Sequence, residues 1–136
     1  MTALDLSADA TPLVIHADDL PRLQRCILLA TGTSREPIAD DLEDELRRAR
    51  VLPGVLVPPD VVVLGARVTF EDESTRVRKD VVVVLPDEAD AGAGRVSVLS
   101  PVGGALLGLR VGQRIAWDLP HGQTVLRVVG VEQRRR

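Results

Sequence analysis

The sequence predicts an α+β fold, in which a short antiparallel helical hairpin precedes a small β-sheet domain that holds one short helix. Residues 18–50 contain two segments with helical spacing of apolar residues, separated by a short polar connection. From residue 51 onward, Pro and Gly residues interrupt the chain and short valine-rich runs alternate with turn residues. A length of 136 residues suits one ordinary domain, or a small domain with an appended element.

The first helix is predicted to begin near residue 19, after a loose lead-in over residues 1–16 in which residues 13–15 could form an edge strand. Asp18 or Asp19 is expected to cap this helix. Gly32 follows its last turn, as is typical of a helix C-terminus. The apolar residues at helical spacing are Leu20, Leu23, Ile27 and Ala30.

The second helix is expected to start at Pro37, because proline is well tolerated in the first helical turn. Its acidic residues come first and its arginines last, which matches the helix dipole. The apolar stripe consists of Ile38, Leu42, Leu46 and Ala49. Because the connection between the two helices is short, they are expected to form an antiparallel hairpin over residues 17–52.

The sheet domain is predicted over residues 55–133, followed by a solvated basic tail at residues 134–136. Strands are expected at residues 61–64, 66–71, 77–85, 96–99, 114–118 and 124–132. The apolar end of the 77–85 strand is expected to be buried on both faces. Ser100 as the N-cap and Pro101 as the first helical residue predict a short helix through residue 107.

The sequence offers little catalytic chemistry. His16 and His121 have no nucleophile nearby in the sequence, so both are read as exposed polar residues, and Cys26 as a half-buried small hydrophobic residue. Without a Cys/His cluster no zinc site is expected. Asp40, Asp41 and Asp44 could hold a hard cation loosely, but such a run is usually a solvated helix face. We therefore expect neither an enzyme nor a cofactor.

Composition excludes several function classes. A net charge of −3, one Phe, one Trp and no Tyr argue against autonomous nucleic-acid binding, which uses basic surfaces and aromatic stacking. The apolar runs are far shorter than the roughly 20 residues that cross a bilayer. The acidic start of the sequence does not resemble a signal peptide. A single cysteine fits a reducing compartment, so a cytoplasmic location is expected.

Residues 97–112 carry the most specific motif, with the sequence SVLSPVGGALLGLRVG. It closely resembles the S-P-L-G-x-A-L-L-G-x-x-x-G-D signature of the C-terminal domain of bacterial Gre transcript-cleavage factors. Residues 63–68 and 115–122 are similar to the opening strand and the closing hairpin of that domain. The short helical pair is most similar to the regulator of nucleoside diphosphate kinase subgroup of the family. Gln113 departs from the pattern, which usually has Asp there.

The resemblance implies an FKBP-like C-terminal sheet domain that docks on the rim of the RNA polymerase secondary channel. Gre-type factors then extend a long coiled coil whose tip carboxylates help to hold the catalytic magnesium of the polymerase. Here the first helix, roughly residues 19–30, would reach only about 18 Å. Only Asp40, Asp41 and Asp44 are candidate acids near the tip, and they do not match the cleavage motif of the family.

The leading hypothesis is therefore a monomeric regulator that binds RNA polymerase, competes with Gre-type factors and does not stimulate cleavage. Its apolar 100–109 segment is either core or a partner surface. The residues expected to contact the polymerase are Ser100, Pro101, Val102, Gly103, Leu106, Leu107 and Leu109. The alternative is a true cleavage-stimulating factor that acts through the acidic residues of the hairpin. Two further alternatives are an interaction module for another protein and a prolyl isomerase, whose aromatic-lined pocket one Phe and one Trp cannot build.

Overall fold

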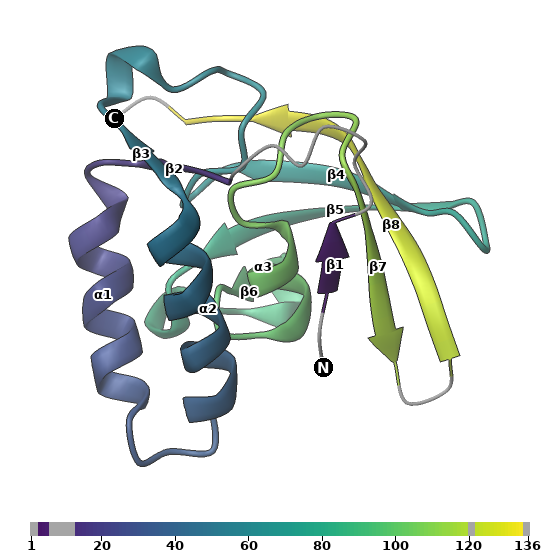
Figure 1. Cartoon of the computed structure of the whole chain (residues 1–136). Coiled ribbons are helices and arrows are strands. Elements are labelled where there is room, and N and C mark those ends of the chain that lie inside the picture. The colour runs from purple at the N-terminus through teal and green to yellow at the C-terminus, as the bar shows by residue number, and fades with distance from the viewer. Residues whose placement is uncertain (1–2, 6–12, 120–121, 135–136) are drawn as a thin grey trace.

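The computed structural model describes residues 3–5, 13–119 and 122–134 (Figure 1). The N-terminal part contains β1 (Ala3–Asp5), β2 (Val14–His16), α1 (Asp19–Ala30), α2 (Glu36–Arg48) and β3 (Arg50–Leu52). The C-terminal part contains β4 (Arg67–Asp72), β5 (Val77–Val84), β6 (Arg95–Ser97), α3 (Pro101–Leu106), β7 (Arg114–Leu119) and β8 (Gly122–Glu132). Short 3₁₀ turns occupy Gly54–Leu56, Pro86–Glu88 and Ala91–Ala93.

Helices α1 and α2 run side by side in opposite directions, as predicted (Figure 1). Gly32 has a φ of +80°, which explains why a glycine follows α1. At the tip, the Thr33 hydroxyl donates a 2.6 Å hydrogen bond to the Ala30 carbonyl oxygen. Pro37 lies in the first turn of α2, as predicted. Asp18 occupies the N-cap position of α1, as predicted, but its side chain makes no capping hydrogen bond.

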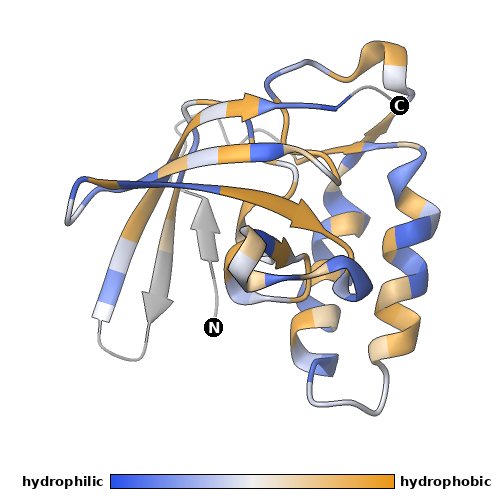
Figure 2. Cartoon of the chain, turned by 180° about the vertical axis from the view of Figure 1, so that it is seen from behind, coloured by the Kyte–Doolittle hydropathy of each residue, from blue (hydrophilic) through white to orange (hydrophobic). Residues whose placement is uncertain are grey.

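Six strands form the main sheet in the order β1-β7-β8-β4-β5-β6. The β4–β5 and β7–β8 pairs are antiparallel hairpins, and β4 also pairs with β8 through a register shift between Thr69 and Phe70. The parallel β5–β6 pair needs a crossover, which the 3₁₀ turns at residues 86–93 provide. Figure 2 shows β5 changing from hydrophilic near its hairpin turn to hydrophobic at its end, where the adjacent Val83 and Val84 are both buried.

The lead-in was predicted to be loose apart from a possible strand at residues 13–15, and the structure has a strand there, β2, and a further one, β1, near the start of the chain. Ala3–Asp5 adds an edge strand to β7. Val14–His16 pairs in parallel with Arg50–Leu52, and only the second of these two strands, β3, was not predicted from the sequence. This second, two-stranded sheet joins the residues before α1 to those after α2, so it closes the base of the hairpin.

Residues 61–64 are not a strand, contrary to the prediction. Their four apolar side chains are buried, and Val62 N–H donates a 2.8 Å hydrogen bond to the Leu109 carbonyl oxygen. Val61 forms an isolated antiparallel bridge with Arg110. The segment therefore packs as an extended loop against residues 108–111 and not within the main sheet.

A single large core connects the hairpin to the sheet domain. Buried side chains of α1 and α2, including Leu23 and Leu42, belong to the same cluster as Val68 and Val83 of the sheet. Helix α3 lies between α2 and the sheet (Figure 1) and contributes Leu106 to this core. The hairpin is consequently packed onto the sheet domain through this shared core, while its tip extends beyond the sheet (Figure 1).

Candidate functional site

The segment that begins at Ser100 has a clear local structure. The Ser100 hydroxyl caps α3 by accepting a 3.2 Å hydrogen bond from the Gly103 N–H, and it donates at 2.6 Å to the Ser97 carbonyl oxygen. Pro101 is exposed at the start of the helix, and Val102 is half-buried against the core. The surface offered to a partner by this segment is therefore its N-terminal turn.

Of the two readings of the apolar 100–109 segment, core or partner surface, its leucines follow the first, although they were expected to contact the polymerase. Leu106, Leu107 and Leu109 are 0%, 2% and 2% exposed. They are buried because the segment from α3 to residue 109 lies between the sheet and the helical hairpin, and all three side chains belong to the core that these two parts share. Gly103 is also buried, directly against the backbone of β6. Among the predicted contact residues, Ser100, Pro101 and Val102 retain accessible surface.

The acids of the hairpin do not gather into a site. Asp40, Asp41 and Asp44 are all exposed on α2, and Asp44 forms an ion pair of 3.5 Å with Arg47. The carboxylate nearest the tip belongs to Glu36 and accepts a 3.4 Å hydrogen bond from the Gly32 N–H. Among the described residues no group of three or more His, Cys, Asp or Glu side chains is placed to hold a metal ion.

A groove of about 630 Å³ lies between α1, the hairpin tip and the segment that follows β5. Three arginines line it, from two turns of α1 and from the tip, together with one acid, Asp87. Cys26, Ala30, Leu85 and Leu99 add buried or half-buried apolar surface. This groove was not predicted from the sequence, because its lining comes from segments far apart in the chain that no spacing rule connects. The arginines are Arg22, Arg25 and Arg35.

A buried carboxylate joins the hairpin to the sheet domain beside this groove. Asp19 is 1% exposed, and its Oδ2 accepts a 3.1 Å hydrogen bond from the Leu64 N–H. Its Oδ1 lies 3.6 Å from Nη1 of Arg22, whose Nη2 is 3.8 Å from a carboxylate oxygen of Glu88. The base of α1 is thus tied by polar contacts to residues 64 and 88 of the sheet domain.

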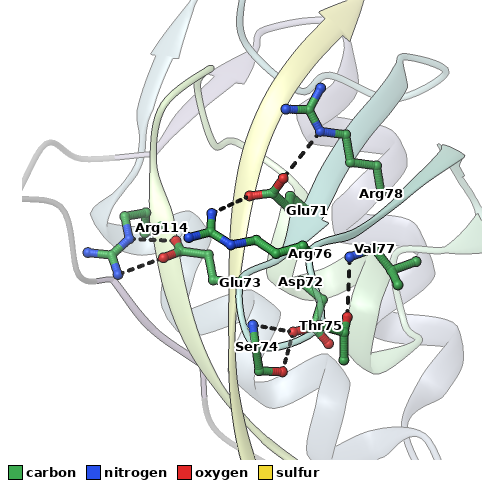
Figure 3. Close-up of polar contacts among 9 residues, drawn as sticks. All are labelled: Glu71, Asp72, Glu73, Ser74, Thr75, Arg76, Val77, Arg78 and Arg114. Carbon is green, nitrogen blue, oxygen red and sulfur yellow. Dashed lines mark hydrogen bonds and ion pairs between the residues drawn. The ribbon is translucent and has the colours of Figure 1, made fainter.

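The turn between β4 and β5 carries a second polar cluster, shown in Figure 3. The Glu71 carboxylate, 7% exposed, pairs with Arg76 at 3.4 Å and with Arg78 at 3.3 Å. Glu73 accepts two hydrogen bonds from Arg114, at 2.6 and 3.0 Å, and these lower the pKa of Glu73. These carboxylates are paired with arginines of the same cluster. The cluster therefore has a structural role, which is to hold the β4–β5 turn against β7.

Hydroxyl groups stabilise the neighbouring carboxylate. Asp72 accepts hydrogen bonds from the hydroxyls of Ser74 and Thr124, at 2.6 and 2.7 Å. These bonds lower the pKa of Asp72 because they favour its charged form.

The remaining candidate residues have structural environments. His16 lies in β2, where its Nδ1 accepts a 3.0 Å hydrogen bond from the Asp18 N–H, and it is half-buried instead of exposed. Cys26 is buried, and this burial raises the pKa of its thiol. His121 and the end of the basic tail lie outside the described residues. No helix in the described part of the chain is long and apolar enough to cross a membrane.

Comparison with known proteins relates this chain to a family by its sequence. The family model for the C-terminal part of the transcription elongation factors GreA/GreB matches residues 57–133. A regulator of nucleoside diphosphate kinase from Escherichia coli (strain K12) is 44% identical over 100 residues, which are 71% of each chain. A transcription elongation factor GreA from Sphingopyxis alaskensis is 40% identical over 97 residues, covering 71% of this chain but 61% of its own.

Solved structures agree with the sequence matches. A prokaryotic transcription elongation factor GreA/GreB from Nitrosomonas europaea superposes with a TM-score of 0.73 at 36% identity and covers 90% of this chain and 99% of its own. Gfh1 from Thermus aquaticus gives a TM-score of 0.51 at 29% identity, with coverages of 90% and 100%. The resemblance stated from residues 97–112 is confirmed, and the chain belongs to the GreA/GreB family of transcription elongation factors.

Proposed function

We propose that this chain is a regulator that binds RNA polymerase at the rim of its secondary channel, in the cytoplasm and as a monomer, without stimulating transcript cleavage. Family membership supports a transcription factor whose partner is RNA polymerase. The finer assignment, that it occupies the channel rim without cleavage, rests on the dimensions of the hairpin.

The length of the hairpin is the observation that carries the proposal. Helices α1 and α2 have 12 and 13 residues. At 1.5 Å per residue, each spans about 18–20 Å. Both helices also contribute side chains to the same core as the sheet, so much of this length is used in packing. An arm of this size is too short to carry side chains from the rim deep into a channel.

The positions of the acidic residues in the hairpin also argue against stimulated cleavage. The tip residues 31–36 contain one acid, Glu36, and not an acidic pair. Asp40 and Asp41 lie about one turn or more along α2, exposed to solvent. Stimulated cleavage requires carboxylates that approach the catalytic metal, and the hairpin presents a single one at its end, which is bonded to the backbone of the tip itself. The alternative, a cleavage-stimulating factor acting through the hairpin acids, receives no support from this arrangement.

The experiment is a binding and cleavage assay with core RNA polymerase. We expect the chain to bind the polymerase, to be displaced by an added Gre factor, and to slow Gre-stimulated cleavage in a backtracked elongation complex. By itself it should produce no cleavage above the intrinsic rate. Cleavage by the parent chain that is lost in Asp41→Ala would refute the proposal and establish the alternative.

The docking segment is tested at its exposed N-terminal turn. Pro101→Glu adds a charge at the first position of α3, where an acid is compatible with the helix. We expect it to weaken polymerase binding, whereas Pro59→Glu, at another exposed proline, should leave binding unchanged. Equal binding of both variants would place the docking surface elsewhere on the domain.

A further inference from the structure

The groove along α1 combines positive charge with apolar surface in a way that the fold does not require. Arg25 and Arg35 are exposed, and neither forms an ion pair with any of the described residues. Arg22, the third arginine, is shared between Asp19 and Glu88 at 3.6 and 3.8 Å. The chain as a whole has a net charge of −3, so these unpaired guanidinium groups run against its overall charge.

An exposed leucine stands at the rim of the same groove. Leu28 and Leu29 are neighbours on α1 and are 72% and 68% exposed. Leu29 lines the groove and Leu28 does not. Leu85 and Leu99 lie in the same lining, so Leu29 extends an apolar surface that begins between the hairpin and the sheet domain.

The groove also adjoins the predicted docking turn. Leu99 belongs to its lining and immediately precedes Ser100 and Pro101. One continuous surface of a partner bound to that turn would therefore also cover the groove. Pro86, in the 3₁₀ turn after β5, forms part of the opposite wall.

We propose that this groove receives a segment of RNA polymerase that carries carboxylates beside an apolar side chain. The carboxylates pair with Arg25 and Arg35, and the apolar side chain packs on Leu29 and the surface behind it. Arginine suits this role because its guanidinium binds carboxylates in a bidentate manner. The inference rests on the proposed function, since it names the part of the surface that gives the polymerase contact its charge specificity.

Other occupants fit the groove less well. Single-stranded nucleic acid stacks its bases on aromatic side chains, but the groove lining contains none, and Phe70 is buried in the core. The most acidic stretch that a second copy of this chain could offer is α2. In this stretch Glu43, Asp44 and Glu45 already pair with Arg47 and Arg48 of the same helix.

The test measures binding of full-length variants to immobilised core RNA polymerase at low and high ionic strength. Leu29→Asp is compared with Leu28→Asp, because both place a carboxylate at similarly exposed positions of one helix. Arg25→Glu/Arg35→Glu is compared with Arg50→Glu/Arg95→Glu, which makes the same change in net charge at exposed arginines outside the groove. Thermal melts monitor folding, and a variant that unfolds is replaced by Leu29→Ser or Arg25→Ala/Arg35→Ala.

We expect the two groove variants to lose about tenfold or more in affinity, and the two control variants to stay within about twofold of the parent. The affinity of the parent should fall as salt rises, and that of the double arginine variant should depend less on salt. Parent-like binding by the groove variants, or equal losses in the controls, overturns the inference while the proposed function stands. A parent chain that does not bind the polymerase overturns both.

Two further outcomes would overturn the inference in favour of another occupant. One is a parent that sediments as a dimer while Arg25→Glu/Arg35→Glu sediments as a monomer. The other is a parent that binds single-stranded RNA through these arginines while the groove variants keep their affinity for the polymerase.

Discussion

Replacing Gly103 by alanine tests how tightly α3 is seated on the sheet. A Cβ at this position would lie 2.7 Å from the carbonyl carbon of Ser97 and closer still to its oxygen, whereas ordinary contacts begin at 3.4 Å. The helix and β6 would have to separate by about 0.7 Å to clear the carbonyl carbon, and by more than that to clear the oxygen. The Ser97 carbonyl cannot move freely, because it accepts hydrogen bonds from the backbone N–H and the hydroxyl of Ser100 at 2.9 and 2.6 Å.

The expected cost follows from these contacts. Overpacking in a well-packed region costs about 1–3 kcal/mol, and here the obstacle is backbone, which places Gly103→Ala at the upper end. The better helix propensity of alanine returns at most about 1 kcal/mol. We therefore expect the free energy of unfolding to fall by about 2 kcal/mol, which corresponds to a urea midpoint lower by about 1 M.

The assay is equilibrium urea unfolding followed by circular dichroism, with Gly92→Ala as the matched control. An added Cβ at Gly92 meets only a side-chain oxygen of Asp90 at 3.5 Å, so this variant should unfold like the parent. An unchanged midpoint for Gly103→Ala would show that α3 is not held against β6 as described. Equal losses in both variants would show that the contact with Ser97 is not the cause.

Three other changes have defined outcomes. Asp19→Ala removes the buried acceptor of the Leu64 N–H and should lower the free energy of unfolding by about 2 kcal/mol, measured by urea unfolding. The lowered pKa of Asp72 means that its stabilising contribution is complete at neutral pH and is lost as pH falls below about 4. Unfolding between neutral pH and about pH 3 should therefore show a smaller acid loss for Asp72→Asn than for the parent. The thiol of Cys26, with its pKa raised by burial, should react with iodoacetamide more slowly than free cysteine, and equal rates would contradict its placement in the core.

Local rules predicted the helices well because the signals for them are local. Each of these signals acts within a few residues. They are the spacing of Leu23 and Ile27, the positive φ at Gly32, and Pro37 in the first turn of α2. The same holds for the cap of α3, where Ser100 accepts from Gly103 as predicted. The strands after residue 66 were also found within one or two residues, since their alternation and turns are contained in the sequence.

The errors concern contacts between distant segments. Asp19 looks like a capping residue, but it is drawn into the core because the Leu64 N–H needs an acceptor 45 positions away. Leu106, Leu107 and Leu109 look exposed when the segment around α3 is considered alone, and they are buried because the hairpin and the sheet enclose them in one core. The pairing of β2 with β3 could not be predicted from local patterns either, since one strand precedes the helical hairpin in the sequence and the other follows it.

The closed base of the hairpin has a consequence for how arm length can vary. The Arg50 N–H donates a hydrogen bond to the Leu13 carbonyl oxygen, and the Ala17 N–H donates one to the Leu52 carbonyl oxygen, both at 2.8 Å. These bonds hold the start of α1 and the end of α2 together at the base of the hairpin. Equal insertions beside the tip would leave this fastening intact and lengthen the arm by about 10 Å for every seven residues per helix. The same insertions would carry Arg35 away from Leu85 and Pro86, with which it now lines the groove. A chain of this fold therefore has either a long hairpin or this groove. If the hairpin is extended, the tip no longer forms one wall of the groove.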